Sequence, residues 1–523
     1  MNSIDRRFLL RTGLAAAGAA ALAACTGRTG APAGSAPRGL VGPSGSAVTA
    51  AEAKRRSTGR EHRLALAAAP AVLDLGGGVT PKTWAYTGLT PGREVRVTAG
   101  DTVVADLSNQ LPGKTTTSAH WHGIALRNDM DGAPGVTQSA VGSGSSFTYR
   151  FVTDTPGTYF FHSHVGVQLD RALHVPLIVE DPAEPLGYDD EWVVVLDDWL
   201  DGIDGTPDDA LAELRQRMGG PGDMHGMRDM QGTDGPGRDG GSSAQRFTLS
   251  GTDSPLLGGE TGDVNYPYHL INGRIAADPA VRTAKPGTKL RLRIINAGAD
   301  TAYRVALGGH RMTITHTDGY PVRHREVDAL LLGMGERYDV LVTLGDGVFP
   351  LVAEAEGKRA SGLAVLRTGK GTAPAPGVRP AELGGEIVTA SELTAADEVS
   401  LKPAEPDVTH RIRLTGSMAT YDWAVNGVPY DMDDPLANPV VVEEGQRVRL
   451  DFVNASRMWH PMHLHGHTYQ LGTSGPRKDT TIVRPGRTVP VYFDARNPGE
   501  WMLHCHNLYH GAVGMMAVLA YRT

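Results

Sequence analysis

Three segments of the chain share one strand-forming pattern. Each begins with a glycine, continues as an alternation of apolar and polar residues, and reaches an asparagine nine positions later. The segments are residues 100–109, 287–296 and 445–454. Such alternation is typical of a strand with one buried face, bounded by turn residues. Because the pattern recurs three times, it predicts an all-β chain of three consecutive Greek-key β-sandwich domains.

Length and composition agree with this architecture. The chain has 523 residues, which is about three domains of ordinary size. Its 66 glycines and 34 prolines favour many turns and short strands. We expect the domains at 61–185, 186–380 and 381–523. Within the second, residues 207–217 predict a short helix, and residues 218–245 are rich in Gly, Asp and Met and predict a surface loop.

The N-terminus has the features of an export signal. Residues 6–11 (Arg-Arg-Phe-Leu-Leu-Arg) resemble a twin-arginine motif, and a short apolar run follows at 14–24. Leu22-Ala-Ala-Cys25 resembles a lipoprotein cleavage box, so we expect a signal at 1–25, and lipid on Cys25 as the only membrane attachment. The alternative is a plain secretory signal. Residues 26–60 have the composition of a flexible linker. Both readings predict an exported protein, in the cell envelope or secreted.

Histidines are concentrated in four short clusters, and the only other cysteine besides Cys25 lies in the last of them. Two clusters fall in the first predicted domain, two in the third and none in the second. The clusters are His120-Trp-His122; His162-Ser-His164; His460-Pro-Met-His463-Leu-His465; and His504-Cys505-His506, followed by His510 and Met515.

The spacing of these residues indicates metal binding. Residues i and i+2 of a strand project to the same face, so each His-x-His pair can direct two imidazoles to one place. A thiolate, two imidazoles and a weak thioether define a blue-copper site, which Cys505, His460, His510 and Met515 would supply. Eight histidines then remain for a second, multinuclear site. His504 and His506 would point away from the Cys505 sulfur, so the backbone would join the two sites.

A single His-x-His pair carries little weight, since it could be polar surface or part of one structural zinc site. Four clusters with a cysteine and a suitably placed methionine are difficult to explain in that way. His467 duplicates no ligand position, so we expect it to pack near the site without binding metal.

The four motifs resemble those of three-domain, laccase-like multicopper oxidases. The similarity covers about residues 70–523 and includes Thr83-Trp-Ala-Tyr86, Asp131-Gly132 with Thr137-Gln138, and Gly157-Thr-Tyr-Phe160. The resemblance implies three cupredoxin domains and four copper ions: one type 1, one type 2 and a type 3 pair. It also implies one-electron oxidation of a donor coupled to reduction of dioxygen to water.

Roles follow from the resemblance, position by position. His460, Cys505 and His510 would bind the type 1 copper, with Met515 as axial ligand, and His120 and His463 would bind the type 2 copper. The type 3 pair would be held by His122, His162, His164, His465, His504 and His506. Asp131 resembles the family's acid beside the type 2 copper, whereas the Glu that many relatives carry after the second type 1 histidine is replaced here by Gly511.

The donor is left open between phenols or aromatic amines and cuprous ion. Thioethers suit Cu(I), and the loop holding Met218, Met224, Met227 and Met230 could deliver it, which would fit a role in copper tolerance; the same methionines could equally be incidental. A copper nitrite reductase-like enzyme and a non-catalytic copper-binding cupredoxin protein are the alternatives. The net charge of −8 argues against nucleic acid as a partner, and a chain holding every ligand can act as a monomer.

Overall fold

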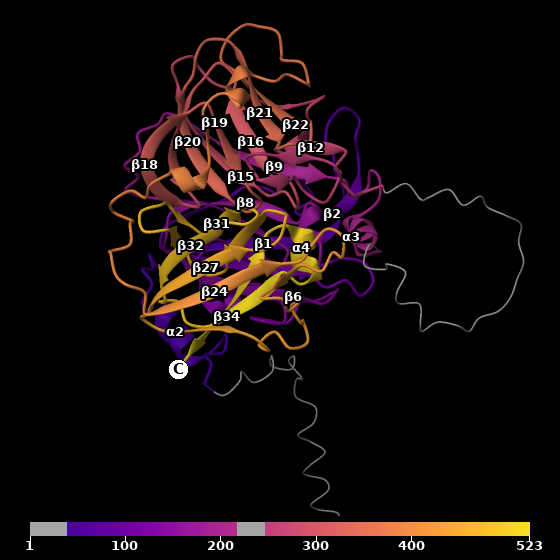
Figure 1. Ribbon diagram of the computed structural model, residues 1–523. Coiled ribbons are helices and arrows are strands. Elements are labelled where there is room, and N and C mark those ends of the chain that lie inside the picture. Colours follow the sequence, from indigo (N-terminus) through magenta and orange to yellow (C-terminus); the bar gives the residue numbers. More distant parts are fainter. Residues whose placement is uncertain (1–38, 217–245) are drawn as a thin grey trace, which may run out of the picture. The chain divides into compact units, whose positions relative to one another are not determined.

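The computed structural model describes residues 39–216 and 246–523. Nearly all of its regular structure is β-strand, gathered in three pairs of sheets (Figure 1). The expected signal, Cys25 and the methionine-rich loop lie outside the described residues. Within the part that is described, no helix is long and apolar enough to cross a membrane.

The first domain consists of two four-stranded sheets. The first has the order β2-β1-β4-β6, formed by Lys82–Tyr86, Glu61–Val72, Asp101–Asn109 and Ser146–Thr153. The second has the order β3-β8-β7-β5, formed by Val95–Thr98, His174–Glu180, Gly157–His162 and His120–His122. Buried side chains from both sheets, among them Val103, Trp121 and Phe151, share one hydrophobic core. The strands that carry the first two histidine clusters, β5 and β7, are neighbours.

The middle domain has the largest sheet, of seven strands, and both of its sheets lie at the top of Figure 1. One has the order β13-β12-β9-β15-β20-β17-β18: Arg274–Ile275, Tyr268–Ile271, Asp190–Trp199, Lys289–Asn296, Arg337–Thr343, Met312–Thr317 and Tyr320–Val327. The other has the order β14-β22-β21-β16-β19-β23: Ala280–Thr283, Ala360–Arg367, Val348–Ala355, Tyr303–Leu307, Ala329–Leu332 and Ile387–Val388. A small hairpin, β10 (Asp253–Ser254) with β11 (Gly259–Glu260), lies outside both sheets.

The third domain carries the other two clusters. Its first sheet has the order β25-β24-β27-β32-β29-β30: Ala424–Val425, Val408–Thr415, Arg447–Asn454, Thr488–Asp494, Tyr469–Leu471 and Arg477–Lys478. Its second has the order β26-β34-β33-β28-β31: Val440–Glu443, Met516–Arg522, Glu500–Cys505, His460–Leu464 and Thr480–Val483. The strands β28 and β33, which carry the third and fourth clusters, are again neighbours.

The predicted threefold repeat is present, as β4, β15 and β27. Each of these strands pairs in parallel with the first long strand of its domain and antiparallel with a later one. Each ends in a buried asparagine: Asn109, Asn296 or Asn454. In all three, the side-chain amide donates to two backbone carbonyls and its oxygen accepts the N–H two residues on. The asparagines therefore satisfy backbone groups where each strand leaves its sheet.

Helices are few and short in residues 39–216 and 246–523. They are α2 (Ser46–Glu52), α3 (Pro207–Gln216) and α4 (Leu508–Val513), with 3₁₀ turns at Asn128–Met130, Gln168–Asp170, Ala381–Gly384 and Ala390–Glu392. The short helix predicted at 207–217 is thus confirmed as α3. The helix α4 was not predicted; its N-terminus is capped by the Asn507 side chain, which accepts from the N–H groups of Tyr509 and His510.

Two segments differ from the sequence prediction. The expected linker, 26–60, is folded over its described residues. There α2 forms, Val41 and Val48 are buried, and the Val41 N–H donates to Tyr521 O at 2.8 Å. Composition could not reveal this, because the stabilising partner is the C-terminal strand β34. The expected boundary at 380 is also too early, since β23 pairs in parallel with β19 and so belongs to a sheet of the middle domain.

Candidate metal centre

Strand pairing brings the histidine clusters together in two steps. In the first domain, His120 lies opposite His162 in the β5–β7 register. In the third domain, His463 lies opposite His504 in the β28–β33 register. The faces carrying these side chains meet across the interface between the two domains, where His164 Nε2 lies 3.4 Å from His504 Nε2.

Eight imidazoles form overlapping groups at this interface. In each group, one nitrogen per residue lies within 4.8 Å of the others. The groups are His120 with His122 and His463; His122 with His162 and His506; and His164 with His465 and His504. Every group combines residues from the first and third domains, so neither domain could form the centre alone.

In most of these rings, one nitrogen forms a hydrogen bond with the surrounding protein and is called the outer nitrogen. The other, inner nitrogen is the one available to a metal. The Nδ1 atoms of His120, His162 and His504 contact the backbone oxygens of Asp131, Ser163 and Cys505, each at 2.9 Å. The nitrogens without a hydrogen-bond partner among the described residues are Nε2 of His120, His162 and His463, Nδ1 of His122, and both ring nitrogens of His506. Buried nitrogens are seldom left unpaired, and metal-bound imidazoles have their other nitrogen fixed in this way. The donor set therefore fits copper ions at the centre of the groups.

Burial also keeps these imidazoles in the form that binds metal. It lowers the pKa of His504 to about 3 and holds the pKa values of His162, His164 and His506 well below the ordinary value, with neighbouring imidazoles adding to the effect. A neutral imidazole is the ligating species.

A second group lies on the opposite side of β33. The Sγ atom of Cys505 lies 3.6 Å from Nδ1 of His460 and 3.6 Å from Nδ1 of His510, and the two nitrogens are 3.0 Å apart. The helix α4 begins just after Cys505 and returns His510 to it. Met515 is buried, and its backbone oxygen accepts the Cys505 N–H at 3.0 Å. Burial raises the pKa of the Cys505 thiol, and a bound cupric ion would stabilise the thiolate instead.

The outer nitrogens of this second group also lie close to polar side chains. His460 Nε2 lies 2.8 Å from Ser456 Oγ. His510 Nε2 lies 2.9 Å from Asp263 Oδ2, which accepts the Tyr421 hydroxyl at 2.6 Å. The indole of Trp423 lies 4.3 Å from the His510 ring, centroid to centroid. All these neighbours are nearly or fully buried, so both rings are held in one orientation.

Two carboxylates contact the interface imidazoles. Asp131, expected from the family resemblance, accepts from His465 Nδ1 at 2.8 Å, and its other oxygen lies 3.3 Å from His120 Nδ1. Asp479 was missed, because no pattern marks it; its Oδ1 lies 3.1 Å from His122 Nε2. Burial alone would raise the pKa of Asp479, but Arg337 and the two imidazoles beside it, His122 and His463, hold that pKa well below its usual range.

His467, which was expected not to bind metal, points away from both groups. Its Nδ1 donates to the His465 carbonyl oxygen at 3.0 Å, and its Nε2 lies 2.7 Å from the Tyr521 hydroxyl. Ser456, Asp263 and Arg337 were not predicted either, because each reaches the site from a distant segment without a motif of its own.

Comparison with known proteins agrees with the geometry. Sequence models described as multicopper oxidase match residues 70–184, 190–371 and 403–523. Multicopper oxidase MmcO of Mycobacterium tuberculosis is 46% identical over 527 residues, which cover 99% of this chain and 98% of that protein. A copper resistance protein A homolog of Pseudomonas syringae pv. tomato is 28% identical, with 81% and 86% covered.

Solved structures show the same fold. The crystal structure of Fet3p, described as a multicopper oxidase that functions in iron import, matches with a TM-score of 0.71 at 20% identity, covering 88% of this chain and 90% of that one. The three domains are therefore cupredoxin-like β-sandwiches. The chain belongs to the multicopper oxidase family. It is accordingly an oxidoreductase that uses copper.

Proposed function

We propose that the chain binds four copper ions. His460, Cys505 and His510, with Met515 as axial ligand, would hold a type 1 copper. His120 and His463 would hold the type 2 copper. The type 3 pair would be held by His122, His162 and His506 on one side and His164, His465 and His504 on the other. The observation that carries this proposal is the set of unpartnered inner nitrogens between the first and third domains.

In the proposed reaction, a donor is oxidised one electron at a time at the type 1 site, and dioxygen is reduced to water between the histidines of the first and third domains. Copper supplies the redox chemistry when bound. The chain supplies the connection: Cys505 lies between His504 and His506, so a covalent path of adjacent residues joins the two sites. Asp131 would help hold the type 2 and type 3 ligands and accept or donate protons beside them.

A cavity of about 400 Å³ beside the interface would admit dioxygen and water. Its lining residues include His164, His504 and Gly511. The family resemblance leads us to expect a glutamate at the position of Gly511, and the glycine present here supplies no carboxylate. Protons would therefore reach the site through solvent in the cavity or through Asp131.

We propose cuprous ion and phenols as donors, with a role in copper tolerance. Two observations support this: relatives include proteins named for copper resistance, and residues 218–245 contain four methionines. Steady-state oxidation of Cu(I) and of a phenol, before and after deletion of 218–245, tests the donor. Cuprous oxidation should fall while phenol oxidation stays. Unchanged cuprous oxidation in the deletion variant would exclude delivery by the loop.

We further propose export by the twin-arginine route and a lipid on Cys25, supported by the motif at residues 6–11 and by Leu22-Ala-Ala-Cys25. Replacing Arg6 and Arg7 by lysine should retain the protein inside the cell. Export of this variant at the normal level would contradict the proposed route.

A further inference from the structure

The middle domain contributes no proposed copper ligand, yet its backbone lies against two of the ligand histidines. Gly335 lies in the turn just before β20, with φ of +83°. A Cβ added there would lie 2.9 Å from Cδ2 of His506 and 3.0 Å from Cε1 of His122. The turn therefore packs directly against ligand imidazoles that come from the other two domains.

Arg337, the first residue of β20, extends this contact. Its guanidinium is fully buried and donates two parallel hydrogen bonds to the Asp479 carboxylate, both at 2.7 Å. Its Nε donates to the Thr158 carbonyl oxygen in the first domain at 3.0 Å. One side chain of the middle domain thus links the first and third domains at the histidine centre.

Asp479, which these hydrogen bonds hold in place, in turn contacts two of the imidazoles. Its Oδ1 lies 3.1 Å from His122 Nε2, and its backbone oxygen accepts from His463 Nδ1 at 2.9 Å. Thr480 Oγ1 lies near the same two nitrogens, at 3.2 and 3.1 Å. These contacts leave His122 Nδ1 and His463 Nε2 as the free, inward-facing atoms.

The surrounding residues are shaped for this arginine–aspartate pair. Gly123 directly follows His122 and has φ of +84°. A Cβ added at Gly123 would collide with Nη2 of Arg337 and lie 2.6 Å from Oδ2 of Asp479. The first domain therefore has a glycine, Gly123, where the Arg337–Asp479 pair packs against the chain next to His122.

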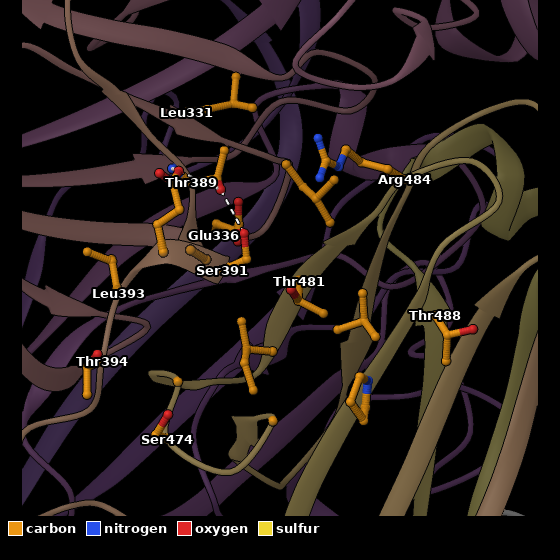
Figure 2. Close-up of a pocket in the computed structure, with 18 of the residues that line it drawn as sticks. Leu331, Glu336, Thr389, Ser391, Leu393, Thr394, Ser474, Thr481, Arg484 and Thr488 are labelled. Atoms are coloured by element: carbon orange, nitrogen blue, oxygen red, sulfur yellow. Dashed lines mark hydrogen bonds between the residues drawn. The ribbon is translucent and has the colours of Figure 1, made fainter.

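Further buried charges hold the pair in place. Asp318 accepts the Arg337 N–H at 2.9 Å and the Asp479 N–H at 3.1 Å. Lys478 Nζ lies 3.2 Å from Asp318 Oδ2 and 3.1 Å from Glu336 Oε1. Glu336 forms part of the wall of a cavity of about 450 Å³ between the middle and third domains (Figure 2). All five charged side chains are at most 1% exposed.

We propose that Arg337 is a positioning residue for the trinuclear centre: acting through Asp479, it fixes the orientation of His122 and His463. Metal-bound imidazoles depend on such outer partners for ring orientation and tautomer. A bidentate guanidinium holds a carboxylate in one plane, which an ammonium group cannot do. The middle domain is then part of the copper centre without supplying a ligand. This inference rests on the proposed assignment of copper to these histidines.

The test compares two lysine substitutions in full-length protein. Arg337→Lys keeps the positive charge but removes the planar guanidinium that donates two hydrogen bonds to Asp479. Arg291→Lys is the matched control, because Arg291 is also buried in the middle domain and paired with a buried aspartate, Asp339, at 2.6 Å. Copper per chain and the electron paramagnetic resonance signal of the non-blue cupric ion are measured in both variants after equilibration with limiting copper.

We expect Arg337→Lys to bind copper at the His120–His463 position about 10–100-fold more weakly while keeping its blue colour. Arg291→Lys should match the unsubstituted protein. Normal non-blue copper in Arg337→Lys, or equal losses in both variants, would overturn the inference. If Arg337→Lys does not fold, Asp479→Asn tests the same link and should show the same selective loss. Absence of copper from the unsubstituted protein would instead contradict the proposed function.

Discussion

The Asp131 carboxylate accepts a hydrogen bond from His465 Nδ1 at 2.8 Å, across the interface between the first and third domains. The same carboxylate lies 3.3 Å from His120 Nδ1. One acidic side chain of the first domain therefore orients rings from both halves of the metal centre.

Replacing Asp131 by alanine should weaken copper retention by the interface histidines about 10–100-fold, because two rings lose the partner that fixes them. Copper content after dialysis against a chelator measures the loss. Asp129→Ala is a suitable control, since Asp129 pairs with Arg127 at 2.6 Å and contacts no histidine of the centre. Equal copper retention in the Asp131 and Asp129 variants would show that the carboxylate has no such role.

Gly335→Ala should reduce copper binding at the interface, because its Cβ would press against His506 and His122 at 2.9 and 3.0 Å. The same substitution at Gly309 provides the control. Gly309 has φ of +75° in the same domain, so its backbone strain is similar, but the nearest atom to an added Cβ is 3.5 Å away. Copper analysis of the two folded variants should show a loss of bound copper in Gly335→Ala and none in Gly309→Ala. A loss of similar size in both variants would show that backbone strain, and not crowding of the ligand histidines, is the cause.

Cys505→Ser should remove the blue colour and about one copper ion per chain, because a hydroxyl is a poor replacement for the thiolate. His467→Gln should keep both, since His467 bonds to the His465 carbonyl oxygen and the Tyr521 hydroxyl and faces neither group. Visible absorption and copper analysis distinguish the two variants. A blue Cys505→Ser protein would refute the type 1 assignment.

Glu500 makes stability depend on pH. This carboxyl is 4% exposed, its Oε1 has no hydrogen-bond partner among the described residues, and burial raises its pKa to about 7 from 4.5. Between these values the unfolded chain releases the proton and the folded protein keeps it, so the folded state loses stability as pH rises.

Glu500→Gln should therefore raise the free energy of unfolding at pH 8 by up to about 3 kcal/mol, with little effect at pH 4. Denaturant midpoints across this range give the measurement, and Glu405→Gln, at an exposed position, should leave the curve unchanged. A Glu500→Gln curve parallel to that of the unsubstituted protein would contradict the assigned pKa.

The features predicted from sequence were those with a local period. The strand β27 and its two counterparts alternate at period two and end in the same asparagine. His-x-His spacing identified β5, whereas His164, His465 and His506 lie just beyond the ends of β7, β28 and β33. The features that were missed depend on contacts between distant segments. Arg337 lies 142 residues from Asp479 along the chain, and the buried Val41 meets a strand at the opposite end of the sequence. Neither leaves a periodic trace, because each contact involves a single side chain or backbone group.

The most direct test of the account is to measure dioxygen uptake and oxidised donor together, using purified, copper-loaded protein and a phenolic donor. The protein should be blue and should oxidise about four donor molecules per dioxygen, since reduction to water takes four electrons, without releasing hydrogen peroxide. A colourless copper-loaded protein, or about two donors per dioxygen with hydrogen peroxide as product, would contradict it.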